Sequence, residues 1–92
     1  MNLNHHLGSV EPANIANTVY GALNLIQERP PADQLVASCY LFLSLCAAFD
    51  VHVQDVLGAV ENLVDDKEAL SLPEFKALNQ YMNNEIKPHA FL

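Results

Sequence analysis

The architecture of this chain depends on residues 35–49, LVASCYLFLSLCAAF, in which Ser38 and Ser44 are the only polar side chains. An ordinary amphipathic helix carries one apolar stripe, whereas this segment is apolar around nearly its whole circumference. As a helix it spans roughly 22 Å, which is less than the roughly 30 Å hydrocarbon core of a bilayer. We therefore predict that about residues 32–49 form the buried central helix of an all-α domain.

The length and composition of the chain fit a single folded domain. It has 92 residues, of which 51% are hydrophobic and 16% are charged, and this composition argues against intrinsic disorder. We predict one helical domain over residues 1–92, with a flexible N-terminus at 1–8 and a C-terminal tail at 88–92. The first residues are polar and do not resemble a signal peptide, so we expect a cytoplasmic protein.

Three further helices are predicted around the apolar segment. Proline suits the first turn of a helix, which places helix starts at Pro12, Pro31 and Pro73. Ser71 and Glu74 have the spacing of a capping box for the last helix. The apolar positions that recur at helical spacing, and are expected to be buried, are Ile15, Val19, Leu23 and Ile26, then Val53, Val56, Leu57, Val60, Leu63 and Val64, then Phe75, Leu78, Met82 and Ile86. The prediction is a compact four-helix domain.

The apolar segment also bears on the oligomeric state. A helix in a four-helix arrangement normally gives about a third of its circumference to the core, and this one offers nearly all of it. An exposed apolar patch above a few hundred Å² usually marks an interface. We therefore predict a homo-oligomer, most simply a two-fold dimer. The alternative is that the other three helices wrap the segment completely and the monomer is closed.

No catalytic, metal-binding or phosphate-binding motif stands out in the sequence. Cys39 and Cys46 lie about 10 Å apart along one helix, whereas the two Cα atoms of a disulfide lie within about 7 Å, so we expect free buried thiols. The four histidines lack the spacing of metal ligands. We therefore expect no enzymatic activity, no catalytic residue, no metal and no cofactor.

The charge of the chain is concentrated in one region. Eleven acidic residues against four lysines and arginines give a net charge of −7, which disfavours nucleic acid and anionic membranes as direct partners. Six carboxylates fall within residues 50–68. We predict a surface for another protein, possibly a basic one, on the outer face of the third helix and the residues after it: Asp55, Gly58, Glu61, Asn62, Asp65, Asp66 and Glu68.

Gly58 is included in this surface because a glycine inside a helix costs about 1 kcal/mol relative to alanine. Close packing of a partner against it would explain its presence, although sequence drift would explain it equally well. A solvated face without a partner remains the simplest alternative for the acidic residues. Glu61 and Asp65 have a spacing that suits a shared divalent cation, but no further ligand arrives at a defining spacing.

These observations lead to a functional prediction with one alternative. The prediction is a small acidic protein–protein interaction module without enzymatic activity, acting as a regulator, adaptor or inhibitor. The alternative is an acidic antagonist that mimics nucleic acid and blocks a host nucleic-acid-binding enzyme. A mimic needs carboxylates spread along a line at phosphate-like intervals, whereas a docking face needs only a patch. The compact cluster at 50–68 favours the docking face.

Overall fold

The structure, a computed structural model, describes residues 3–88 and is all-α. The predicted fold class is thereby confirmed. Four helices have nine or more residues, and a short helical turn, α4, precedes the last of them. The α-helices are α1 (Pro12–Ile26), α2 (Pro31–Ala48), α3 (Val53–Val64), α4 (Lys67–Leu70) and α5 (Pro73–Tyr81). The 3₁₀ turns η1 (Leu3–His5) and η2 (Leu7–Ser9) come first, and a π-helical turn, η3 (Met82–Ile86), continues α5.

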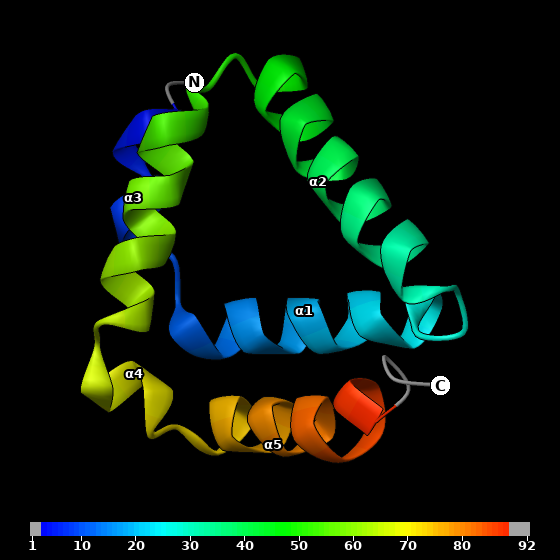
Figure 1. Ribbon diagram of the computed structural model, residues 1–92. Coiled ribbons are helices and arrows are strands. Elements are labelled where there is room, and N and C mark those ends of the chain that lie inside the picture. Colours follow the sequence, from blue (N-terminus) through cyan, green and yellow to red (C-terminus); the bar gives the residue numbers. More distant parts are fainter. Residues whose placement is uncertain (1–2, 89–92) are drawn as a thin grey trace.

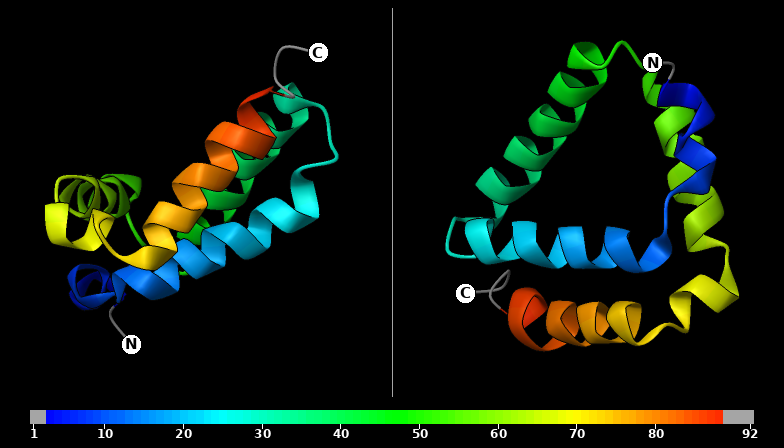
Figure 2. Two further views of the ribbon diagram at one scale, coloured as in Figure 1. Left: turned by 90° about the horizontal axis from the view of Figure 1, so that it is seen from below. Right: turned by 180° about the vertical axis from the view of Figure 1, so that it is seen from behind.

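Three helices form the sides of a triangle, and the fourth doubles one side (Figure 1). The sides are α1, α2 and α3, and α5 runs beside α1, as the view from below also shows (Figure 2). The molecule measures 42 × 30 × 18 Å. Since one helix with its side chains is about 10–12 Å wide, the shortest dimension is less than two full helix layers.

The core lies between α1 and α5. Ala16 and Leu23 of α1 are buried against Phe75 and Leu78 of α5. Ala16 and Leu23 are two turns apart and therefore share one face of α1. The partly buried residues that surround this core are Val19, Ile26, Leu63, Leu70, Leu72, Tyr81, Met82 and Ile86. The predicted apolar faces of the first and last helices are confirmed here.

The corner between α1 and α2 is fixed by two glutamines. The side-chain amide of Gln34 donates to the carbonyl oxygens of Arg29 and Gln27, at 2.7 and 3.3 Å. The side-chain oxygen of Gln27 accepts a hydrogen bond from the hydroxyl of Tyr81. Pro31 occupies the first turn of α2, as predicted. These bonds tie the end of α1 and the start of α2 to the end of α5.

The turn from α2 into α3 is a Schellman motif. The amide of Val51 donates to the carbonyl of Cys46 at 2.9 Å, and the amide of Asp50 donates to that of Ala47 at 3.3 Å. Asp50 has a φ of 55°, the left-handed conformation that this motif requires. The prediction that Asp50 forms the helix exit is confirmed. His52 precedes the first residue of α3 without making a side-chain cap.

The predicted capping box is wrong. Leu72, not Ser71, precedes the first residue of α5, and no side chain caps that helix. Ser71 instead ends α4, where its hydroxyl donates to the carbonyl of Glu68 at 2.7 Å. The sequence predicted a polar connector at residues 65–68, but residues 67–70 form the short helix α4. Ser71 is the C-cap residue of α4 and does not cap α5.

Residues 3–9 are the first described part of the chain and precede α1. These residues form the regular turns η1 and η2, and η2 packs against α3. Residues 1–2 of the predicted flexible segment, and 89–92 of the predicted tail, lie outside the described residues.

The nearly fully apolar helix forms as predicted, but the structure does not bury it. Cys46 is the one buried residue of α2, and Phe42 is half-buried. The reason is that α1 and α5 bury their apolar faces against each other, while α3 packs on η2 and α4. No described helix remains to cover α2. Leu57, Val60 and Val64 of α3, which were also expected in the core, are exposed for the same reason.

The left-handed residue provides a stability test. Asp50→Ala should lower the free energy of unfolding by about 1 kcal/mol, because alanine lacks the short polar side chain that lets aspartate tolerate a positive φ. Asp50→Gly should leave the free energy of unfolding unchanged or raise it, because glycine has no Cβ to strain. Urea unfolding at a fixed protein concentration measures both. Asp65→Gly is the control, since Asp65 ends α3 with a φ of −84° and gains nothing from glycine. Equal effects of alanine and glycine at position 50 would contradict the assigned turn.

Candidate protein interaction surfaces

The largest exposed apolar area lies on α2. Leu35, Val36 and Tyr40 expose 75%, 71% and 73% of their surfaces. We call the α2 apolar surface the set of large apolar side chains that are exposed on this helix and its last turn: Leu35, Val36, Tyr40, Leu41, Leu43, Leu45 and Phe49. Six of these side chains lie on the 18-residue helix, and Phe49 follows it as the C-cap residue.

Within α2, one exposed stripe has the spacing of a helix-pairing face. Phe42 and Cys46, one turn apart, mark the side that contacts other elements. About a third of a turn around the helix from that side lie residues spaced four, three and four apart, which follow one face of a helix. This α2 seam consists of Val36, Tyr40, Leu43 and Ala47, all of them exposed.

The third helix repeats this arrangement. Leu63 of α3 packs against the core cluster, and Val56 and Ala59 are half-buried. A second apolar stripe with the same spacing of four, three and four lies beside them. This α3 stripe consists of Val53, Leu57, Val60 and Val64, of which the last three are exposed. Two adjacent sides of the triangle therefore each carry an open apolar stripe.

The total surface shows how incomplete the packing is. The chain has an accessible surface of 7132 Å², whereas a folded monomer of 10.1 kDa is expected to expose about 5,300 Å². The excess is about 1,800 Å². The radius of gyration, 14.2 Å, likewise exceeds the roughly 12 Å expected for a single domain of this length.

The predicted acidic face is assembled on the outer side of α3. Asp55, Glu61, Asn62 and Asp65 are all exposed. Helical spacing places Asp55 and Asn62 opposite the α3 stripe and Glu61 at its edge, one turn from Leu57. Glu68 is exposed one element further on, in α4. Asp55, Glu61, Asn62 and Asp65 thus lie along the outer side of α3, and Glu68 lies beyond the end of that helix.

Two other predicted members of this face have different surroundings. The carboxylate of Asp66 caps α4, accepting hydrogen bonds from the amides of Glu68 and Ala69 at 3.0 and 3.2 Å. Gly58 is half-buried, yet a Cβ added to it would meet nothing within 4 Å. Crowding inside the chain therefore does not explain this glycine.

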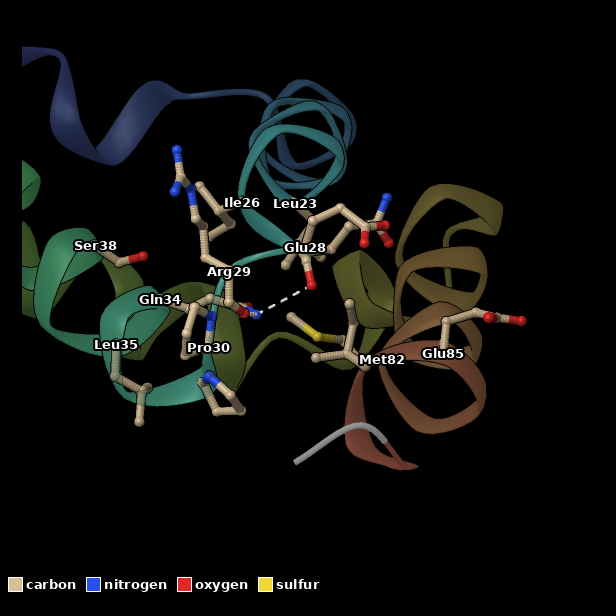
Figure 3. Close-up of a pocket in the computed structure, with 13 residues that line it drawn as sticks. Leu23, Ile26, Glu28, Arg29, Pro30, Gln34, Leu35, Ser38, Met82 and Glu85 are labelled. Atoms are coloured by element: carbon tan, nitrogen blue, oxygen red, sulfur yellow. Dashed lines mark hydrogen bonds between the residues drawn. The ribbon is translucent and has the colours of Figure 1, made fainter. Parts of the chain in front are cut away.

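A groove that sequence reasoning missed lies at the corner of α1 and α2 (Figure 3). Its volume is about 700 Å³. Leu23, Ile26, Met82 and Ile86 give it an apolar wall, and Gln34 forms the polar one. Only the prolines at 30 and 31 signal a sharp corner in the sequence, and they do not reveal that η3 faces it.

The cysteines and the potential metal ligands give two further findings. Both thiols are free, as predicted, but Cys39 is exposed and only Cys46 is buried. The expectation of a buried thiol at position 39 is wrong, because Cys39 shares the side of Cys46 but lies two turns earlier in α2, where the helix is exposed. Within residues 3–88, no three histidine, cysteine, aspartate or glutamate side chains are placed to hold a metal ion.

By length and composition alone, α2 also meets the criteria for a membrane-spanning helix. It has 18 residues with a mean hydropathy of 1.3, and 6% of it is buried. It is the one helix among residues 3–88 that does so. Helices that expose apolar side chains in this way occur at protein interfaces and in membranes.

Comparisons of this chain with protein-family models, with curated proteins and with solved structures found no match. The roles of the α2 apolar surface, the acidic face and the groove are therefore inferred from their own chemistry.

Gly58 allows a test of the acidic face. Gly58→Ala should raise the free energy of unfolding by about 0.5–1 kcal/mol, because alanine is the better helix former and its Cβ enters open space. Gly21→Ala on α1, also free of neighbours, is the matched control and should stabilise by a similar amount. Thermal unfolding at equal concentrations measures both. A loss of stability in the Gly58 variant alone would show that the site is crowded in the assembled protein.

Proposed function

We propose that this chain is a small acidic protein–protein interaction module without enzymatic activity, which acts as a regulator, adaptor or inhibitor. Its α2 apolar surface joins chains together, and the outer face of α3 binds a protein with a basic surface. The observation that carries this proposal is the apolar surface that α2 leaves open in the single chain.

The size of that surface supports association as the working state. Soluble monomers rarely expose apolar patches above a few hundred Å², and larger patches mark interaction sites. Burying apolar area contributes about 25 cal/mol per Å², so even part of an excess of about 1,800 Å² would drive association. The composition adds support, since the exposed residues of α2 include Tyr40 and Phe49, and aromatic side chains are enriched at interfaces.

The position of the acidic face supports a second, simultaneous contact. Asp55 and Asn62 lie on the side of α3 opposite its apolar stripe, and Glu61 lies at the edge of the stripe. A partner at Asp55 and Asn62 therefore leaves the apolar stripe open to a second contact. Complementary charge speeds the encounter of two proteins and makes their association sensitive to salt. A basic surface is the complement of a chain whose net charge is −7.

Neutralising the acidic face tests this function. The variant Asp55→Asn, Glu61→Gln, Asp65→Asn should lose a stoichiometric basic protein that the unaltered chain retains from lysate of its native cell. Raising the salt concentration from about 0.05 to 0.5 M should release the same protein, because exposed charge pairs are screened. Retention is measured on immobilised protein by quantitative mass spectrometry.

The matched control removes the same number of charges elsewhere. Glu11, Glu28 and Glu85 are exposed and lie outside α3, so Glu11→Gln, Glu28→Gln, Glu85→Gln has the same net charge as the acidic-face variant. The control should retain the partner. Equal retention by both variants, or equal loss from both, would contradict a specific site on α3.

A further inference from the structure

The α2 seam has the spacing of a helix-pairing interface. Val36, Tyr40, Leu43 and Ala47 alternate in steps of four and three, which is the a and d pattern of helices that pack side by side. All four are exposed, and no charged residue falls within the seam.

We propose that a second copy of this chain covers the seam, with the two α2 helices antiparallel across a two-fold axis. This inference rests on the proposed function and names the partner of its apolar surface. The axis passes between positions 41 and 42. Val36 then faces the partner's Ala47, and Tyr40 faces the partner's Leu43.

The sizes of the side chains favour this direction. In the antiparallel pair, Tyr40 meets the smaller Leu43 and Ala47 meets the larger Val36, so the layers along the seam differ less in volume than they would in a parallel pair. In a parallel pair Tyr40 would meet the partner's Tyr40 and Ala47 would meet the partner's Ala47, which crowds one layer and leaves a void in another. Overcrowded layers and voids each destabilise an interface, as they do a protein core. Antiparallel helix dipoles also attract each other.

The α3 stripe extends the same interface. In Figure 1, α2 and α3 diverge from the turn that joins them. The Schellman bonds at Asp50 hold this turn in one conformation. The partner's α2 lies between these two helices, with one side on the α2 seam and another on Val53, Leu57, Val60 and Val64. The common spacing of the two stripes is what contact with one straight helix requires.

The excess accessible surface of the chain is large enough for the interface of a permanent dimer. The excess of about 1,800 Å² per chain corresponds to about 3,600 Å² for two chains, within the 2,000–5,000 Å² typical of obligate homodimers. A transient contact of standard size buries only about 800 Å² per partner and would leave more than half of the excess open.

Charge favours a second copy over lipid. Within α2 there is no lysine or arginine, and Asp33 and Asp50 lie at its two ends. Membrane helices are normally anchored by basic residues at their ends, and anionic lipid surfaces repel a chain with a net charge of −7. In the dimer these carboxylates, and the acidic faces of both α3 helices, remain in water.

The oligomeric state gives the first test. Light scattering on the full chain should give about 20 kDa, twice the 10.1 kDa of one chain. Tyr40→Glu and Leu43→Glu should each raise the dimer dissociation constant by about 100-fold or more, because both copies bring the charge into the centre of the interface. Asn24→Glu, an exposed site on α1, adds the same charge and should have no effect.

Two results would overturn the proposal. One is a 10 kDa species at tens of micromolar for the unaltered chain. The other is binding to phosphatidylcholine vesicles that is equally strong for the monomer and the dimer. In that case α2 would be free for lipid in the dimer and would not be covered by a second copy. Circular dichroism of each variant verifies that the helices are intact.

Engineered cysteines test the direction of the helices without adding charge. In a Cys39→Ser background, Val36→Cys together with Ala47→Cys should form disulfide-linked dimers under mild oxidation. These positions are about 16 Å apart within one helix, so such a link joins two chains. Val36→Cys alone should stay unlinked. Efficient linking of that single variant would require parallel helices and would overturn the antiparallel pair.

The experiments distinguish failure of the dimer from failure of the proposed acidic binding face. A monomeric chain that still retains a basic protein through α3 would overturn the seam and leave the proposed function intact. A dimer from which the acidic-face variant loses nothing would support the seam and contradict the basic partner.

Discussion

The packing of α1 against α5 is the contact on which the rest of the structure depends. It buries Ala16 and Leu23 against Phe75 and Leu78 and so brings together the first and the last long helix of the chain. Because each of these helices has a single apolar face, the contact leaves neither of them able to cover α2. The glutamines at 27 and 34 then hold α2 at the corner of this pair. An apolar helix is thus fixed in position while its surface stays open.

The third helix, α3, has three sides with different chemistry. Leu63 reaches the core, Val53, Leu57, Val60 and Val64 form an open apolar stripe, and the carboxylates of Asp55, Glu61 and Asp65 lie on the remaining side. An open apolar stripe and an acidic surface therefore lie side by side on α3 and its C-cap residue Asp65. In the account proposed above, assembly presents two acidic faces from one particle, which would strengthen binding to a partner that has two basic sites.

The local signals in the sequence predicted more of the structure than the composition did. Pro12, Pro31 and Pro73 begin helices, and Asp50 adopts the left-handed conformation that ends α2. These features depend on neighbouring residues alone. The burial of α2 could not be predicted in the same way, because apolar composition shows that a helix must be covered but not by which chain. Ser71 failed as a cap since α4, four residues long, competes for it.

The most direct test of the account is a nuclear Overhauser measurement between the methyl groups of Val36 and Ala47. These groups lie about 16 Å apart in one helix, too far for a cross-peak within a chain. A sample mixed from differently labelled chains should show the cross-peak between chains, as the antiparallel pair predicts. Absence of the cross-peak, together with the tumbling time of a single 10.1 kDa chain, would contradict the claim that α2 is covered by a second copy.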